Sequence, residues 1–342
     1  MAIQSSTRRE FLATASAAAA AMLPVAARGS ALQSAARWPL GCHTRPFTSF
    51  LATQAANPDY VLDAVKSAGF EFADMISAGG GGGRGAGAPA TAAPGAAPQR
   101  GRGVPATPEE VAALKQKLVA RGLKSNIASF PTVQRGVPLE EAVANARKLI
   151  ANAHTLGQKY ALNLGIEDYD RWADWCKVLA DAAAFGQERG VKVVVKHHHG
   201  LQNTSMDLIA WTKQVNHPNF GVFFDPGNVV YYTGKDPVKD LEVVGPYVSG
   251  VVAKDCSAPH FMERAAGAPP FGVEVTGAGN PEVMIQFGTG KVDFAAFFKR
   301  LKSFGFNGPV MVEGTKVGAT LEETIANARA NREFLERVFA GS

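Results

Sequence analysis

The sequence predicts an α/β protein built as one (β/α)8 TIM barrel, and two observations support this prediction. Short apolar runs alternate with helix-length segments eight times along the 342 residues. Several helix-length segments end in a glycine directly before the next apolar run, as helices commonly do; these glycines are Gly122, Gly157, Gly190 and Gly305. Repeated strand–helix units form a parallel sheet with helical crossovers, and eight such units close into a barrel.

The predicted strands are short and mostly rich in β-branched or aromatic residues. The alternative is a doubly wound open sheet, which usually has fewer strands. No Gly-x-Gly-x-x-Gly follows the first strand, so we expect a barrel and no nucleotide cofactor. In chain order the expected strands are Pro39–Cys42, Phe70–Ile76, Ser125–Ser129, Tyr160–Leu164, Lys192–Lys196, Gly221–Phe224, Val248–Ala253 and Val310–Val312.

The helix-length segments between these strands carry ordinary start signals. Thr107-Pro108-Glu109-Glu110, for example, combines a capping residue, a proline and first-turn acids. The clearest predicted helices are Pro108–Arg121, Leu139–Leu156, Asp170–Glu188, Asn203–Val215 and Val292–Phe304.

The composition is that of a soluble globular protein with a substantial core, with 46% hydrophobic and 19% charged residues. The formal charge of +5 is small, and no run of Lys and Arg suggests a nucleic-acid partner. The three cysteines have no metal-like spacing and predict no disulfide framework.

Residues 1–35 are expected to be a twin-arginine signal peptide rather than part of the fold. The pair Arg8-Arg9 precedes an Ala-rich apolar run from Ala13 to Ala27. An amphipathic N-terminal helix is the alternative. No other stretch approaches a membrane-spanning length. The sequence therefore predicts a periplasmic protein, with no membrane partner after export and a single barrel domain over residues 36–342.

Two insertions interrupt the strand–helix rhythm, and both follow the carboxyl ends of strands. Gly79–Thr107 consists almost entirely of Gly, Ala, Pro and Arg, a composition that predicts a mobile loop. It is interpreted as a tolerated low-complexity insertion, with a functional lid as the alternative. Ser257–Thr289 is richer in polar groups and contains His260.

Five expected strands end in polar, mostly charged residues, and in a β/α barrel these ends converge on one cavity. Alternation along the fifth strand decides which side chains face that cavity. If Val193 and Val195 face the helices, Lys196 and His198 face the barrel axis, although the opposite phase is possible. The strand ends are Cys42–Arg45, Lys196–His199, Asp225–Asn228, Lys254–Cys256 and Glu313–Gly314.

Six stretches of the chain, in order and on these strand ends, resemble the sugar phosphate isomerase/epimerase group of the xylose isomerase-like barrels. The resemblance covers residues 38–340. The stretches are Thr44–Phe47, Lys196–Gly200, Phe224–Asn228, Val252–Asp255, Gly288–Phe294 and Gly308–Glu313.

This family usually holds a divalent metal, often manganese, with Glu, Asp, His and Glu from strands 5 to 8. The resemblance implies that Asp225 and Glu313 occupy two of these positions. The first Glu corresponds to Lys196 in this chain, and the His corresponds to Val252. The family's substrate-contacting His corresponds to Asn228. This chain thus lacks two of the four metal ligands and carries an ammonium group beside the others.

The substitution leaves two alternatives for the chemistry. A cation about 4 Å from a divalent ion costs several kcal/mol at an effective dielectric near 20, so the metal is either absent or displaced. A displaced Mn²⁺ or Zn²⁺ would be held by His198, Asp225 and Glu313, with Lys196 neutral or turned away. Without metal, Lys196 and Lys254 would stabilise a developing oxyanion, and Glu313 or His198 would act as the base.

Further residues are expected to bind the substrate. Arg45 and Asn228 would hold sugar hydroxyls, and His43, Asp255 and His260 complete the predicted binding set. The structural alternative is that the charged strand ends merely form ion pairs, Lys196 with Asp225 and Lys254 with Glu313.

The resemblance implies an isomerase or epimerase that removes a proton next to the carbonyl of a keto-sugar or related polyol. The same enediolate could expel a β-substituent, so a lyase or hydratase acting on an oxidised sugar or glycoside is one alternative. A non-catalytic sugar-binding barrel is another. The expected partner is a small sugar, and a homodimer is one assembly that the resemblance implies.

Overall fold

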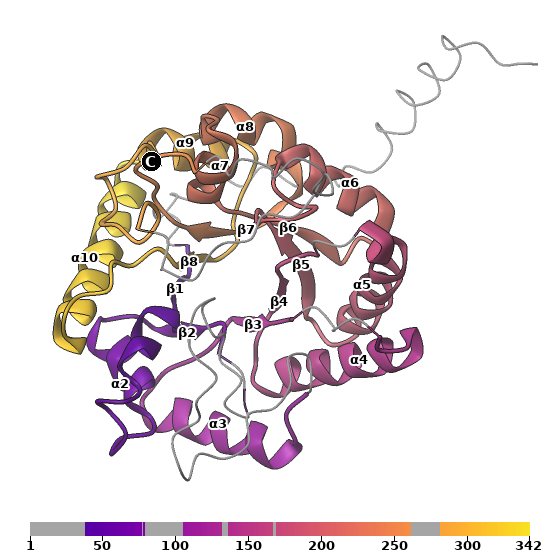
Figure 1. Cartoon of the computed structure of the whole chain (residues 1–342), viewed down its shortest axis with the longest axis horizontal. Helices are drawn as coiled ribbons and strands as arrows, with labels where there is room; N and C mark the ends of the chain where they lie inside the picture. Colours follow the sequence, from indigo (N-terminus) through magenta and orange to yellow (C-terminus); the bar gives the residue numbers. More distant parts are fainter. Residues whose placement is uncertain (1–37, 77, 79–104, 132–135, 167–168, 261–280) are drawn as a thin grey trace, which may run out of the picture. The chain divides into compact units, whose positions relative to one another are not determined.

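Eight parallel strands form a nearly closed barrel that is surrounded by an outer ring of helices (Figure 1). The computed structural model describes residues 38–76, 78, 105–131, 136–166, 169–260 and 281–342. The predicted fold is confirmed, and the strand bounds differ from the expected ones by at most two residues. The strands are β1 Leu40–His43, β2 Phe72–Asp74, β3 Ile127–Ser129, β4 Tyr160–Asn163, β5 Lys192–Lys196, β6 Phe220–Phe224, β7 Val248–Ala253 and β8 Val310–Val312.

The sheet runs in the order β2-β1-β8-β7-β6-β5-β4-β3, so the first and last strands in chain order are neighbours. In the β1–β8 pair, Cys42 lies opposite Val312. The remaining seam, between β2 and β3, is bridged by separate backbone hydrogen bonds. The Met75 N–H donates to the Ile127 carbonyl at 2.8 Å, and the Ala73 N–H donates to the Lys124 carbonyl at 2.8 Å.

The outer helices are close to those predicted, with several additions that the sequence analysis did not delimit. A capping box at Thr107 and Glu110 starts α3, as the start signal indicates. The segment after β6 folds into two short helices, α7 and α8, instead of one crossover. The helices are η1 Arg45–Phe50, α2 Tyr60–Ser67, α3 Pro108–Ala120, α4 Leu139–Thr155, η2 Tyr169–Arg171, α5 Trp172–Gln187, α6 Ser205–Val215, α7 Pro226–Thr233, α8 Pro237–Val244, η3 Gly245–Tyr247, α9 Phe294–Ser303 and α10 Leu321–Ala340.

The barrel interior is filled by an apolar plug of inward-facing side chains, which is separate from the larger core between strands and helices. On β5, Val194 belongs to the plug, whereas Val193 and Val195 pack in the outer core. The strand therefore has the alternation phase in which Lys196 faces the barrel axis. The plug consists of Met75, Ile127, Leu162, Val194, Phe223, Val252 and Met311, with Tyr160 packed against it.

Four members of the plug are each followed two residues later by a charged residue. Val194 precedes Lys196, Phe223 precedes Asp225, Val252 precedes Lys254, and Met311 precedes Glu313. Since side chains two apart on a strand share a face, these charged groups point inward at the carboxyl end of the plug.

Several expectations fall wholly or partly outside the described residues. These are the signal segment 1–35, most of the insertion 79–107, and residues 261–280 of the second insertion. Within the described part of the chain, no helix has the length and apolar character needed to cross a membrane.

We predict that Phe223→Ala destabilises the barrel, because Phe223 is fully buried in the plug and its ring lies 5.1 Å from that of Tyr160. The free energy of unfolding should fall by about 3–5 kcal/mol in urea denaturation. Met206→Ala on α6 is the control, since Met206 is 62% exposed and its truncation should change stability by less than about 0.5 kcal/mol. A loss below about 1 kcal/mol for Phe223→Ala would contradict the packed interior.

Candidate active site

Four charged side chains from the ends of consecutive strands meet above the apolar plug. Lys196 Nζ lies 2.9 Å from Asp225 Oδ2 and 2.7 Å from Glu313 Oε2. Lys254 Nζ lies 2.9 Å from Glu313 Oε1 and 3.4 Å from Asp225 Oδ2. Each ammonium group therefore contacts both carboxylates, and we call Lys196, Asp225, Lys254 and Glu313 the four-charge cluster.

The four-charge cluster is almost completely shielded from solvent. Asp225 is 0% exposed and Lys196 1%, whereas Lys254 is 5% and Glu313 8% exposed. Removing such charges from water is costly unless each finds an opposite partner, and two cations with two anions make the cluster neutral. The small exposure of Glu313 makes it the carboxylate of the two that a bound molecule can reach.

The proton affinities in the cluster follow from this pairing. Burial would raise the pKa of Glu313, but Lys196 and Lys254 more than offset it and hold that pKa well below its usual value. Burial would lower the pKa of Lys254, but Asp225 and Glu313 outweigh it, so that the pKa is raised. At neutral pH Glu313 is therefore a carboxylate and Lys254 an ammonium group.

The start of α7 holds part of the cluster in place. Asp225 caps this helix, with its Oδ1 accepting the Asn228 N–H at 2.9 Å. The Asn228 side chain accepts from Lys254 Nζ at 3.2 Å and donates to the His197 carbonyl at 2.8 Å. The structure therefore uses both ends of the Asn228 amide to position Lys254, and its expected contact with a sugar hydroxyl remains a prediction.

A buried network of hydrogen bonds through His197 holds the backbone of Asp225. The Asp225 N–H donates to His197 Nδ1 at 3.3 Å, so the His197 proton sits on Nε2 and faces Ser205 Oγ at 3.0 Å. The Ser205 hydroxyl in turn donates to Asp240. Burial, together with Lys196 and Lys235, lowers the pKa of His197 to about 3, which keeps the ring neutral. This network fixes the backbone at the end of β6.

Three titratable side chains near the cluster are uncharged at neutral pH. Burial lowers the pKa of His43 to about 4, opposed by Glu313 and reinforced by Arg45. Burial and His199 hold the pKa of His198 well below its usual value. The His198 ring centroid lies 6.3 Å from that of Tyr232, whose pKa burial raises. His43, His198 and Tyr232 are therefore uncharged at neutral pH.

Two expected substrate contacts lie apart from the cluster. The fully buried Asp255 accepts hydrogen bonds from the backbone N–H groups of Cys256, Gly288, Gly290 and Val292, which anchor the loop after β7. His260 stacks on Tyr231 of α7 at a centroid distance of 5.4 Å and is exposed. Direct substrate contacts by Asp255 and His260 stay predictions that these bonds do not support.

The donor groups present do not fit a divalent metal. Among the described residues, no group of three or more His, Cys, Asp or Glu side chains is arranged to hold a metal ion. The expected ligand set His198, Asp225 and Glu313 is therefore not formed. The physical reason is that Lys196 is not turned away: its ammonium group, together with that of Lys254, lies against both carboxylates.

Sequence reasoning missed Tyr232 and the Ser205–Asp240 part of the network. A signal for Tyr232 was available, because Asp225-Pro226 combines a helix cap and a first-turn proline and predicts a helix over the next residues. No sequence signal pairs Ser205 with Asp240, since the two are 35 residues apart on different helices.

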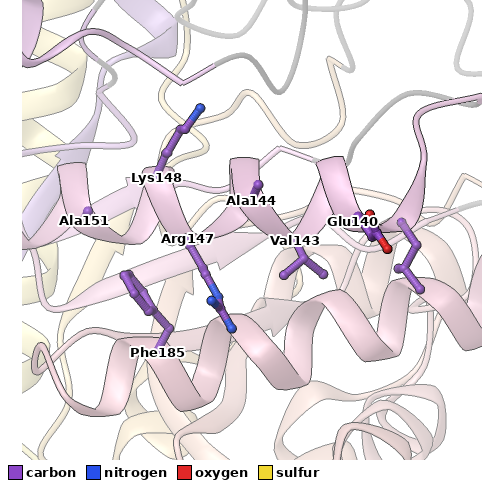
Figure 2. A pocket seen from close by; sticks show the side chains of 8 residues that line it. Glu140, Val143, Ala144, Arg147, Lys148, Ala151 and Phe185 are labelled. Atoms are coloured by element: carbon purple, nitrogen blue, oxygen red, sulfur yellow. The ribbon is translucent and has the colours of Figure 1, made fainter.

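A surface groove lies away from the strand ends, between α4 and α5 on the outer helical layer (Figure 2). It is largely apolar, and Leu139, Val143 and Phe185 form part of its lining. Arg147 lines the groove and forms an ion pair with Asp181 at 2.7 Å. The groove contains none of the predicted site residues.

Comparison with known proteins matches the chain to one family along most of its length. The sequence profile of the xylose isomerase-like TIM barrel family matches residues 62–338. A ketose 3-epimerase of Arthrobacter globiformis is 25% identical over 137 residues, which are 40% of this chain and 38% of that relative. The match thus spans less than half the length of the epimerase.

Solved structures agree with the fold. A D-allulose 3-epimerase from Methylomonas sp. superposes with a TM-score of 0.60 at 16% identity, covering 88% of this chain and 98% of the other. A xylose isomerase-like TIM barrel protein from Mycobacterium smegmatis, solved in complex with magnesium, gives a TM-score of 0.60 at 17% identity, covering 91% and 100%. At these identities the likeness is one of fold.

We predict that Lys196→Met destabilises the protein most at neutral pH. The substitution leaves two buried carboxylates with one cation, and breaking a buried pair costs about 3–5 kcal/mol. Without Lys196, one of the two lysines that hold the pKa of Glu313 low against burial is gone, so this pKa rises. The loss should therefore shrink as the pH falls through that raised pKa, because a protonated carboxyl needs no cation.

Denaturant unfolding of both proteins from pH 4 to pH 8 measures this effect. Lys124→Met is the matched control, since the Lys124–Glu71 pair has the same 2.7 Å length but side chains that are 67% and 57% exposed. Its cost should stay below about 1 kcal/mol at every pH. A Lys196→Met penalty that is equally small, or independent of pH, would contradict the buried cluster.

Proposed function

The chain belongs to the xylose isomerase-like TIM barrel family, and from this premise we propose that it is a sugar isomerase/epimerase-type enzyme. It removes a proton next to the carbonyl of a keto-sugar or related polyol. The relatives with named activities described above are sugar epimerases, which supports the general kind of reaction. The observation that supports the proposal is the four-charge cluster, which brings two carboxylates and two ammonium groups together.

Glu313 is the group proposed as the base. It is ionised at neutral pH, and it is the more exposed of the two carboxylates in the cluster. Asp225 is fully buried and caps α7, so its part is to hold the two lysines. His198 is the alternative base and is neutral at this pH.

Lys196 and Lys254 stabilise the charge that proton removal creates. When Glu313 accepts a proton it loses its negative charge, and the two ammonium groups lose a partner. The negatively charged enediolate oxygen forms at the same moment and replaces the Glu313 carboxylate as the anion beside the two lysines. The site therefore keeps two anions for its two cations. Donors that are already oriented at such a developing charge lower the barrier without reorganisation.

A β-elimination is the second candidate reaction. One reachable carboxylate, Glu313, is sufficient to deprotonate a substrate beside its carbonyl, and expulsion of a β-substituent then needs one acid. The Tyr232 hydroxyl, which interacts electrostatically with Lys196, Asp225 and Glu313, could supply this proton, as could the lysine ammonium groups. A lyase or hydratase acting on an oxidised sugar would thus use the same residues, and a sugar-binding barrel would use them for recognition alone.

Export and assembly belong to the proposal on sequence grounds only. The Arg8-Arg9 pair before an apolar run supports twin-arginine transport to the periplasm. A homodimer is proposed from the resemblance to the family. Fractionation of cells expressing the full chain, with N-terminal sequencing of the periplasmic product, tests the first of these statements.

We predict that the protein catalyses exchange of the substrate's α-proton with solvent and that Glu313→Gln lowers this rate by about 10²- to 10⁴-fold. The amide keeps the shape of the side chain but cannot accept the proton. Deuterium incorporation into a panel of keto-sugars in heavy water, followed by NMR, measures the exchange and also detects elimination products. Glu322→Gln, an exposed site on α10, is the control and should retain the full rate. Undiminished exchange in a folded Glu313→Gln protein would exclude Glu313 as the base, and no exchange with any sugar would leave a binding barrel.

We also predict that this activity needs no divalent metal at the strand ends, because two ammonium groups already neutralise the carboxylates there. Dialysis against a chelator should leave the exchange rate within about twofold and should remove no stoichiometric metal, as measured by elemental analysis. Lys196→Glu places a third carboxylate in the cluster and should gain measurable affinity for Mn²⁺ or Zn²⁺. Loss of wild-type exchange on chelation, with recovery on adding either metal, would contradict the prediction.

A further inference from the structure

Arg45 lies at the edge of the candidate site, and local hydrogen bonds hold its backbone in place. It begins η1 directly after β1, and its N–H donates to His43 Nδ1 at 2.8 Å. The Thr48 hydroxyl donates to the Arg45 carbonyl at 2.8 Å, and the buried Phe47 follows one residue after a buried proline. These contacts hold the first turn of η1 in place, so that Arg45 has a defined position at the carboxyl end of β1.

This position lies beside the four-charge cluster. In the β1–β8 pair Cys42 is opposite Val312, so the next residues along the two strands are His43 and Glu313. The positive charge of Arg45 affects two groups near these residues. It lowers the pKa of His43, and it partly offsets the rise in the pKa of Lys254 that the carboxylates cause. Arg45, two residues after His43 and only partly buried, therefore lies close enough to the four-charge cluster for its charge to act there.

The Arg45 guanidinium has no ion pair or hydrogen bond to any residue that the structure describes. Lys196 and Lys254, by contrast, each contact both Asp225 and Glu313. These four charges cancel, and Arg45 adds a positive charge that none of them balances.

The other described titratable groups around the strand ends are either neutral or turned to other partners. His43, His198 and Tyr232 are neutral at pH 7. Asp255 is turned to backbone amides of the loop after β7. Asp74, at the end of β2, accepts from two backbone N–H groups of the β3 segment, and burial raises its pKa to about 7.

We infer that Arg45 receives an anionic group of the substrate, so that the sugar carries a carboxylate or a phosphate. The guanidinium fork matches both oxyanions in a bidentate geometry. Arg45 is only partly buried, so water solvates its charge in the free protein, and a neutral sugar that covered it would displace this water without supplying a counter-charge. This inference rests on the proposed function in taking the ligand to be a sugar, and it narrows the substrate to sugar acids and sugar phosphates.

Three probes that differ only at C6 test the inference: D-fructose, D-fructuronate and D-fructose 6-phosphate. Binding to the full wild-type protein is measured by calorimetry, and α-proton exchange is measured on the same probes. We expect at least one anionic probe to bind about 10- to 100-fold more tightly than D-fructose, the range that one charge-assisted contact supplies. Comparison of the two anionic probes distinguishes a carboxylate site from a phosphate site.

Variants of Arg45 assign the effect to this residue. Arg45→Gln should weaken binding of the anionic probe much more than binding of D-fructose, so that most of the preference is lost, whereas Arg45→Lys should keep part of the preference. Arg147→Gln is the matched control, because it makes the same charge change on the outer face of α4, where Arg147 pairs with Asp181. It should leave all three affinities unchanged.

The outcomes separate this inference from the proposed function. If an anionic probe binds through Arg45 but no probe exchanges its proton, the inference holds and the enzymatic proposal fails for these sugars. If D-fructose binds or exchanges as well as both anionic probes, or if Arg45→Gln weakens all probes equally, the inference is overturned while the enzymatic proposal stands. Absence of binding by both anionic probes also overturns it.

Discussion

Four ionised side chains share one buried volume at the strand ends, and this is possible only because their charges cancel. An unpaired charge in such surroundings costs several kcal/mol, so each lysine must contact carboxylates and each carboxylate must contact lysines. The observed pattern, in which both ammonium groups touch both carboxylates, meets this constraint. In this arrangement neither carboxylate is free of ammonium contacts, and a molecule that enters meets a site that is already neutral.

The fold supplies this arrangement through the two-residue period of its strands. Val194, Phe223, Val252 and Met311 fill the barrel interior. The charged residues follow two positions later on the same face, where the plug shields them from below. Helix α7 and the His197 network then fix the end of β6, so that Asp225 has little freedom to rotate away from the lysines.

The chain shares its architecture with sugar epimerases, and its strand ends carry a balanced set of two cations and two anions. The same barrel supports many chemistries because strand-end residues can change without disturbing the packed interior. In this chain a lysine stands where the resemblance places a metal-binding glutamate, and a second lysine from β7 completes a neutral cluster. In the proposed reaction the two ammonium groups would stabilise the enediolate electrostatically.

The sequence by itself determined the barrel and the strand ends, because the strand–helix rhythm is a local pattern. It favoured the phase in which Lys196 faces inward, and the packing of Val194 in the barrel interior decided it. The sequence could not determine that Lys196 contacts Glu313, 117 residues away, instead of turning aside, or that Asp255 faces backbone amides after β7. Those outcomes depend on the twist and closure of the barrel, which set the distances between strand ends. The sequence therefore contains two cations and two anions at the strand ends, whereas the pairing of these charges was decided by the tertiary structure, because electrostatic energy depends on distance.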